Sequence, residues 1–234
     1  MFRSQLMQKF QSGYFKGAMY WRGLLGRPAQ TKREIQIFKT VFDTFAHKKV
    51  KIFEWGSGLS SIYFSAYLRE RKIDFQWHSI DNNKLWHDKI KAKIIQRGLH
   101  GCVQLYLKEF LPFWEKAGWE WKKIPPPCGI FGPKSENEKA YIDFPKELNG
   151  KFDIIIIDAR FRRHCLQTAK EALAPEGVVV MHDAQKTHYH FGLDDFLYDK
   201  FFTTGAWYPF QEIPNKVWIG SMGNKTIFDA LMQF

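Results

Sequence analysis

Four short apolar runs, each followed by polar residues, dominate the pattern of this chain. The runs end in Glu54, in Asp81, in Asp158 and in the pair His182 and Asp183. The run over residues 152–157 is apolar on both faces, which is typical of a central parallel strand that helices cover. Because the carboxyl ends of parallel strands meet at one edge of a sheet, we expect these acids to line the edge at which open α/β sheets bind ligands.

Apolar residues at helical spacing lie between the runs, so the pattern predicts alternating strands and helices. The expected helices cover about residues 31–46, 60–71, 84–97, 161–173 and 192–201, and the expected strands cover about residues 50–53, 75–80, 102–107, 152–157, 177–182, 205–211 and 216–222. Thr31 is a good N-cap for the first helix, and the last two strands are expected to be antiparallel around Pro214 and Asn215. Residues 110–150 are the least regular part, and their length indicates a lid or a substrate-facing insertion.

Length and charge indicate one domain with an anionic partner. The 234 residues suit a single α/β domain over residues 31–234, preceded by a basic and aromatic extension over residues 1–30. The 35 basic and 24 acidic residues give a net charge of +11. A basic balance favours nucleic acid, anionic lipid or an acidic glycan as a partner, although solvated lysines alone also account for it.

Two features of the sequence indicate the cellular compartment, namely the three cysteines and the lack of long apolar runs. Cys102, Cys128 and Cys165 lie apart from one another, so they form no metal-spaced pair, and an odd count does not suit a disulfide framework. We therefore expect reduced thiols in a cytoplasmic protein. No apolar run approaches the length that spans a bilayer, and the N-terminus is too polar for a secretory signal.

The segment KIFEWGSGLSS, residues 51–61, has the form of a cofactor cradle. A strand ends in Glu54, a glycine turn follows, and a helix can begin at Ser60 or Ser61. The glycines allow ligand atoms to approach the backbone, and the helix start offers unpaired N–H groups. The acid disfavours a pyrophosphate and favours a ligand with an amine and hydroxyls. Ser61 also stands where a dinucleotide-binding fingerprint has its third glycine, which argues against a nicotinamide dehydrogenase.

The order of these motifs resembles the class I S-adenosylmethionine-dependent methyltransferases. It is closest to a subgroup with E-[WY]-G-S-G-x-S-[ST] in the cradle and D-G-R-x-R-x-x-C after the fourth strand. The matching residues here are Glu54 to Ser61, Ser79 with Asp81, Trp86, Asp158 with Arg160, Arg162 and Cys165, and His182 and Asp183 with Tyr189. The resemblance covers about residues 35–222, and Ala159 departs from the subgroup's glycine. It implies a Rossmann-like seven-stranded sheet in the order 3-2-1-4-5-7-6, with strand 7 antiparallel and helices on both sides, behind an N-terminal helical extension.

The same resemblance implies roles for individual residues. The implied cofactor-binding residues are Glu54, Gly56, Ser57, Gly58, Ser60, Ser61, Asp81, Asn82 and Asp158. The implied catalytic residues are Asp158, His182 and Asp183, and the implied substrate-binding residues are Arg160, Arg162 and Tyr189. Asp81 is expected to accept both ribose hydroxyls, since a carboxylate accepts two hydrogen bonds. Structural readings stand beside these roles: a tight turn for the glycines, a helix surface for the arginines, and helix core for Trp86.

Two readings of Asp158 and Asp183 stay open. In one, Asp158 meets the cofactor amine and His182 or Asp183 is a general base. In the other, the two acids hold a divalent cation, which is chemically reasonable for a hard ion. Families with such a site usually place Asn or Asp after the second acid, where Ala184 stands here, so we do not predict a metal. The histidines near this edge are more often hydrogen-bonded groups than ligands.

S-adenosylmethionine as cofactor implies direct transfer of the sulfonium methyl to a nucleophile. We expect the acceptor atom to be oxygen, in a small molecule or an acidic glycan, because no Asn- or Asp-Pro-Pro-Tyr motif follows the fourth strand. A nucleic-acid methyltransferase acting on RNA is the first alternative, favoured by the charge and the aromatic content. A basic binding module without catalysis, on the same fold, is the second.

Overall fold

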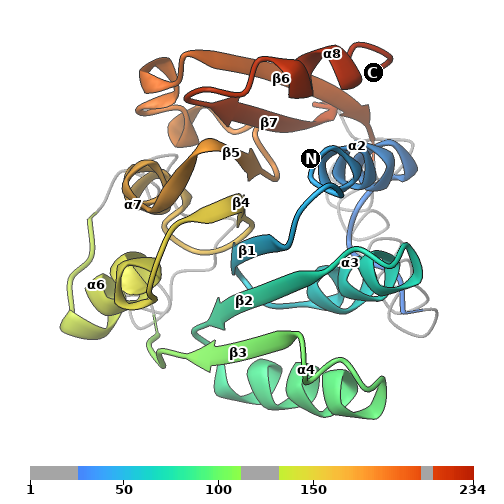
Figure 1. Cartoon of the computed structure of the whole chain (residues 1–234). Helices are drawn as coiled ribbons and strands as arrows, with labels where there is room; N and C mark the ends of the chain where they lie inside the picture. The colour runs from blue at the N-terminus through green and yellow to red at the C-terminus, as the bar shows by residue number, and fades with distance from the viewer. Residues whose placement is uncertain (1–25, 112–131, 207–212) are drawn as a thin grey trace, which may run out of the picture.

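The computed structural model describes residues 26–111, 132–206 and 213–234, and the statements that follow refer to these residues. In them, seven strands form one sheet in the order β3-β2-β1-β4-β5-β7-β6 (Figure 1). Neighbouring strands from β3 to β5 are parallel, and β7 is antiparallel to both β5 and β6. This arrangement confirms the expected Rossmann-like sheet.

The strands are β1 (Val50–Trp55), β2 (Phe75–Asp81), β3 (Val103–Leu107), β4 (Phe152–Ile157), β5 (Leu173–Met181), β6 (Tyr198–Gly205) and β7 (Asn215–Ser221). The α-helices are α2 (Lys32–Thr44), α3 (Leu59–Glu70), α4 (Lys84–Gln96), α6 (Glu136–Asp143), α7 (Arg162–Ala172) and α8 (Thr226–Ala230). Short 3-10 turns are η2 (Phe144–Glu147), η3 (Thr187–Tyr189) and η4 (Leu193–Asp195).

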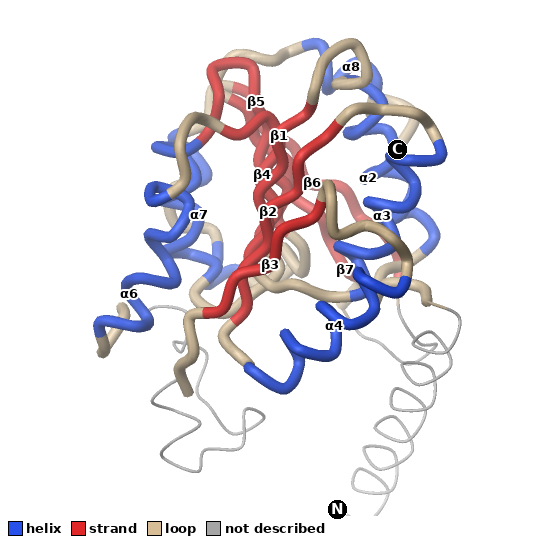
Figure 2. Tube along the Cα trace, turned by 60° about the horizontal axis from the view of Figure 1, so that its bottom comes forward, coloured by secondary structure: helices blue, strands red, loops and turns tan. Residues whose placement is uncertain are grey.

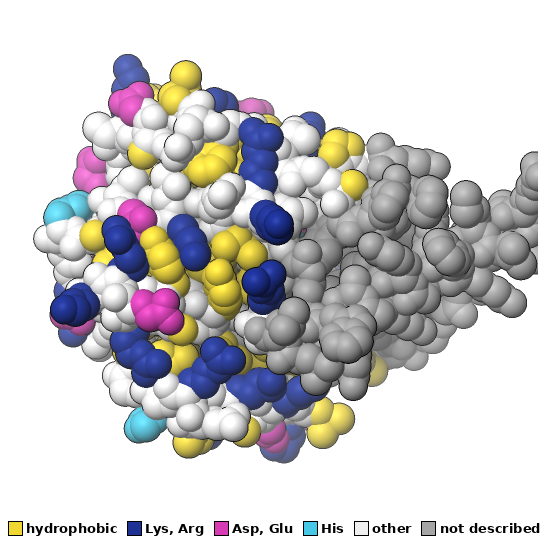
Figure 3. Space-filling model, turned by 90° about the vertical axis from the view of Figure 1, so that its right-hand side faces the viewer, with side chains coloured by type: hydrophobic (Ala, Val, Ile, Leu, Met, Phe, Trp, Pro, Cys, Tyr) yellow, Lys and Arg dark blue, Asp and Glu magenta, His cyan; other side chains and the backbone are white. Residues whose placement is uncertain are grey.

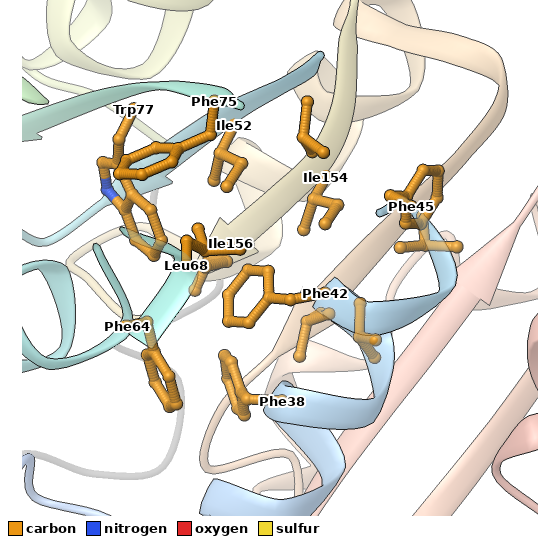
Figure 4. Packing of buried hydrophobic residues seen from close by; sticks show 14 of the residues in the cluster. Phe38, Phe42, Phe45, Ile52, Phe64, Leu68, Phe75, Trp77, Ile154 and Ile156 are labelled. Carbon is orange, nitrogen blue, oxygen red and sulfur yellow. The ribbon is translucent and has the colours of Figure 1, made fainter. Parts of the chain in front are cut away.

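Helices cover both faces of the sheet. Figure 2 shows the sheet nearly edge-on, with α6 and α7 on one side and α2, α3, α4 and α8 on the other. On the second side, aromatic residues of α2 and α3 form the centre of the core. Phe38 stacks on Phe64 with ring centroids 5.1 Å apart, and Phe42 lies 5.8 Å from the Trp77 ring of β2 (Figure 4). Burying such side chains stabilises the fold by about 1.5–3 kcal/mol each, which anchors α2 against the sheet.

The expected helix over residues 192–201 is wrong. Only η4 is helical there, and the chain is already the strand β6 from Tyr198 onward. Phe202 and Thr204 point inward while Thr203 is exposed, and Phe202 pairs with Val217 of β7. Pairing with a distant strand therefore overrides the local helical pattern. The expected strand over 205–211 correspondingly begins too late, and its residues 207–211 lie outside the described part of the chain.

Residues 110–150 contain more regular structure than expected. Their described part includes α6 and η2, and α6 begins with a capping box in which Ser135 and Glu138 bond each other's backbone. The sequence S-x-x-E is a known signal for such a start. The rest of the expected insertion, residues 112–131, lies outside the described residues, as do residues 1–25 of the expected N-terminal extension. Among the helices that the structure describes, none is long and apolar enough to cross a bilayer.

Candidate functional site

The carboxyl ends of β1, β2, β4 and β5 surround a cavity of about 470 Å³. Its walls come from five segments: Pro28–Gln30, Gly56–Ser60, Asp81 and Asn82 with Trp86, Asp158–Arg162, and Asp183 with Lys186 and Tyr189; Tyr141 completes them. Most of the residues singled out from the sequence thus lie around one space. Among the residues that were given a role, Glu54, Ser61 and His182 are the exceptions, since they are buried behind the wall.

Gly56 is the residue that lets the first turn fit against the β4 edge. Its φ is +93°, and a Cβ at this position would lie 2.3 Å from the carbonyl oxygen of Asp158. The Asp158 N–H donates to the Trp55 carbonyl at 3.1 Å, and the Gly56 N–H donates to Ile80 at 2.9 Å. The glycine turn and Asp158 are therefore held together, and only glycine satisfies both the angle and the space.

Glu54 organises the cradle from beneath. Its carboxylate has no exposed surface and accepts hydrogen bonds from Ser60 at 2.7 Å, from Ser79 at 2.9 Å, from the Trp77 indole at 3.1 Å and from Ser61. Burial raises the pKa of Glu54 to about 7, although the four donors counteract it. Ser61 in turn accepts from the Gly58 N–H at 3.0 Å, so the acid fixes both the turn and the start of α3.

Asp81 lies at the end of β2 with one side open to the cavity. The Asn83 N–H donates to one of its oxygens at 2.8 Å, and the Ser57 hydroxyl is 3.3 Å from the other. Burial raises the pKa of Asp81 above its usual value, against the effect of these donors. Neighbouring Asn82 donates to the Phe110 carbonyl at 2.9 Å, which fixes the chain that follows β2.

Trp86 is not a core residue, contrary to the expectation. Its side chain is 37% exposed and forms part of the cavity wall. The indole N–H donates to the Ser57 carbonyl at 2.7 Å, so the first turns of α4 and the glycine turn support each other. Asn83 caps α4 by accepting from the Trp86 N–H at 3.0 Å, which places the indole beside the cavity.

A chain of alternating charges follows β4 and β5 at the edge of the sheet. Asp158 pairs with Arg162 at 2.5 Å and with Nδ1 of His182 at 3.1 Å, and Arg162 reaches Asp183 at 3.7 Å. Lys186 pairs with Asp183 at 3.0 Å. Burial alone would raise the pKa of Asp158, but His182 and Arg162 hold it far below its usual value. The pKa of Asp183 is lowered to about 2 because His182, Arg162 and Lys186 outweigh its burial.

The expected substrate-binding residues differ in how they are placed. Arg160 lies in the cavity wall. Arg162 is only 9% exposed, and it donates to the Tyr189 hydroxyl at 3.1 Å as well as pairing with Asp158. Its charge is therefore engaged within the protein.

Asp183 has φ +58°, a left-handed conformation that is uncommon outside glycine and that often marks functional sites.

The histidines do not form a metal site. No group of three or more His, Cys, Asp or Glu side chains that could hold a metal ion occurs in residues 26–111, 132–206 and 213–234. His182 faces Asp158, while Nε2 of His190 lies 2.8 Å from the Ala184 carbonyl. The His188 ring makes an edge contact with Tyr189 at 4.3 Å. The metal reading of Asp158 and Asp183 thus has no third ligand among the described residues.

Three features of the site were not found in the sequence. Lys186 and Tyr141 belong to no recognisable motif. The wall segment Pro28–Gln30 lies in residues 1–30, which were expected to form an N-terminal extension outside the domain. The sequence did contain a signal for the position of residues 28–30, because Thr31 and Glu34 have the spacing of a capping box. The structure contains that capping box.

Comparisons with known proteins agree with the geometry. A family model described as a methyltransferase domain matches residues 53–184. No curated protein sequence matches the chain. Among solved structures, a proposed O-methyltransferase from Klebsiella pneumoniae is similar with 13% identity and a TM-score of 0.58 over 89% of each chain. The O-methyltransferase TomG from Streptomyces achromogenes, involved in tomaymycin synthesis and solved with S-adenosylmethionine, has 14% identity and a TM-score of 0.52 over 89% of each chain. An O-methyltransferase from Bacillus cereus, solved with S-adenosylhomocysteine, has 11% identity and a TM-score of 0.55 over 88% of this chain and 89% of that one. At these identities the structural similarity establishes a shared fold.

Proposed function

The chain belongs to the methyltransferase-domain family, and on that premise we propose that it transfers a methyl group from S-adenosylmethionine to an oxygen of a small, negatively charged acceptor. An acidic sugar or glycan is one such acceptor. The observation that supports the proposal best is the order of the wall along the sheet edge, with Asp81 and the glycine turn after β2 and β1, and the cationic residues Arg160, Arg162 and Lys186 after β4 and β5. The similar O-methyltransferases solved with this cofactor or its product favour the same chemistry.

The cradle fits S-adenosylmethionine in shape and in donor set. The turn at Gly56 leaves no room for a side chain, so backbone faces the cavity there. Asp81 keeps acceptor capacity beyond its two internal bonds, which suits a pair of ribose hydroxyls. We assign the methionine part to the turn from Gly56 to Gly58, and the adenosine part to Asp81 and Trp86. When bound, this cofactor supplies an electrophilic methyl group on a sulfonium.

The residues of the protein position the reactants and set the local charge. Asp158 stays ionised beside the glycine turn, so we assign it to the amino group of the cofactor. His182 is 5% exposed and is enclosed behind the wall, and we therefore assign it to hold Asp158 through Nδ1. Asp183, with a pKa of about 2, is a weak base for an alcohol. An acceptor oxygen that is already ionised, as in a carboxylate, needs no strong base.

The part of the wall that follows β4 and β5 favours an anion. Arg160, Arg162 and Lys186 are cationic there, against Asp158 and Asp183. The balance is positive before any cofactor binds, and a sulfonium adds to it. Because Arg160 is exposed and lies in the wall whereas Arg162 is buried, we assign the contact with the acceptor to Arg160, with Lys186 in the same wall.

Methyl-labelled S-adenosylmethionine, offered with pairs of acceptors that differ by one carboxylate or phosphate, tests the proposal. We expect label on oxygen of the charged member of a pair. Arg160→Gln should raise the KM for that acceptor about tenfold, the loss expected for one charged contact, and leave binding of S-adenosylhomocysteine within twofold. Arg163→Gln is the control, since Arg163 lies over the Phe191 ring at 4.0 Å, outside the wall. Label on nitrogen, or equal turnover of neutral acceptors, contradicts the proposal.

A second candidate, methylation of RNA, is favoured by the distribution of charge. Figure 3 shows Lys and Arg side chains spread over the face on which α2, α3 and α4 lie. Exposed cationic residues there include Arg33, Arg69, Arg71, Lys89 and Lys91. RNA bound across this face should lose affinity steeply with salt, because binding releases counterions. Transfer of label to RNA that falls steeply as the salt concentration rises would favour this candidate over a small acceptor.

A further inference from the structure

Glu34 is a buried acid in a place where capping acids are usually exposed. It is the third residue of α2, and its capping box with Thr31 has N···O distances of 2.5 Å and 3.1 Å. The side chain nevertheless has no exposed surface. Thr204 of β6 donates to its Oε1 at 2.8 Å, and Nε2 of His182 lies 3.6 Å from the same oxygen. The carboxylate therefore links α2 to the ends of β5 and β6.

The cap alone does not require this charge. Capping boxes accept Gln as well as Glu, because either oxygen can receive the N-cap N–H. Burying a carboxylate costs free energy unless a cation or donors compensate it. Beside the Thr31 and Thr204 donors, the compensating cation here is the His182 imidazole, whose buried Nε2 has no hydrogen-bond partner among the described residues and lies 3.6 Å from Glu34. A second capping acid, Glu138 of α6, is 2% exposed, and its carboxylate accepts from the backbone N–H groups of Lys134 and of the N-cap Ser135.

His182 joins Glu34 to the cavity. Its Nδ1 meets Asp158 at 3.1 Å and its Nε2 faces Glu34, so the ring is held between two carboxylates. Asp158 lies in the wall beside Gly56. On the other side of Glu34, the capping box fixes Thr31, which follows directly after the wall residues Pro28–Gln30. Glu34 thus contacts neither the cavity nor its contents, but it is linked to two parts of the wall, to Asp158 through His182 and to residues 28–30 through Thr31.

From this geometry we infer that Glu34 is a positioning residue of the cofactor site, acting through His182 on the carboxylate of Asp158 and through Thr31 on the wall at residues 28–30. Helix α2 then contributes to the cofactor site. This inference rests on the proposed function, because it concerns how tightly the cavity holds S-adenosylmethionine and its product.

Titration of the full chain with S-adenosylhomocysteine tests the inference. Glu34→Gln keeps the cap and removes the charge, and it should weaken binding about tenfold, as for the loss of one partner in a buried charge network. Glu138→Gln, the matched control in the other capping box, should stay within twofold of the unaltered protein. Thermal unfolding of each variant shows that the titrated protein is folded. If Glu34→Gln does not fold, Thr204→Val, which removes a donor to the same carboxylate, replaces it.

A double-mutant cycle distinguishes an effect of Glu34 that acts through His182 from a general loss of packing around the site. If Glu34 acts through the imidazole, Glu34→Gln should change the affinity by less than twofold in a His182→Gln background. An equal loss in both backgrounds would overturn the inference, and so would unchanged affinity in Glu34→Gln alone. Failure of the unaltered protein to bind S-adenosylhomocysteine would instead overturn the proposed function, and the inference with it.

Discussion

Replacing Glu54 by Gln should change how the stability of the fold depends on pH. The carboxylate is completely buried, and burial raises its pKa from 4.5 to about 7 in spite of four hydrogen-bond donors. Gln has nearly the same shape and no charge to desolvate. The serine hydroxyls around it can turn to accept from the new amide as well as donate to its oxygen.

The sign follows from proton linkage. Between pH 4.5 and pH 7 the folded chain holds the Glu54 proton while the unfolded chain has released it, so stability falls as the pH rises. The stability that the protonated Glu54 contributes to the folded state is fully present below pH 4.5. It is lost as the pH rises through the pKa of about 7 that Glu54 has in the folded chain. A shift of roughly 2.5 units corresponds to about 3 kcal/mol at 1.36 kcal/mol per unit, an order-of-magnitude figure for a buried group.

Urea unfolding of both proteins at several values between pH 5 and pH 8 measures the effect. Subtracting one curve from the other cancels the titration of distant groups. We expect the wild-type protein to lose about 2–3 kcal/mol more than Glu54→Gln over this interval. Parallel curves, or a difference of the opposite sign, would refute the assignment of Glu54 as a desolvated acid beneath the cradle.

Three further predictions concern the cradle and the acidic pair. Gly56→Ala places a methyl group 2.3 Å from the Asp158 carbonyl at φ +93°. The free energy of unfolding, measured with urea, should therefore fall by about 1–3 kcal/mol, and S-adenosylhomocysteine binding should be lost. The control Gly101→Ala, where nothing lies within 4 Å of the added methyl group, should change neither the stability nor the binding. Trp86→Phe removes the 2.7 Å bond to the Ser57 carbonyl and should weaken S-adenosylhomocysteine binding by about 1 kcal/mol in calorimetric titration. Turnover should survive a chelator; loss that Mg²⁺ or Mn²⁺ restores would establish the metal reading of Asp158.

Features set by local sequence were predicted well. The apolar run of β4 and the glycine turn after β1 are written in neighbouring residues, so both the strand and the cradle could be found without a structure. The sheet order came from the resemblance, since pairing partners are not visible in one strand. The edge strand β6 was expected too late in the chain, over residues 205–211, because residues 198–205 form a strand only by pairing with β7.

The positions of the acids of the site could be predicted from the sequence, whereas the contacts between the charged residues could not. Placing Asp158 and Asp183 at one edge needed only the strand ends. That Arg162 would be engaged by Asp158 and Tyr189 depends on how α7 packs over that edge, which no spacing reveals. The contact of Glu34 with His182 joins two segments far apart in the chain, and it became visible only once β6 and α2 were placed together.

Calorimetric titration of the unaltered protein and of Asp81→Ala with S-adenosylhomocysteine is the decisive test of the cofactor site. We expect one site per chain, and binding weaker by about 1–3 kcal/mol in the variant, because a carboxylate that accepts ribose hydroxyls is lost. NAD should not bind. Binding of NAD without binding of S-adenosylmethionine or S-adenosylhomocysteine would contradict the account, as would equal affinity of a folded Asp81→Ala.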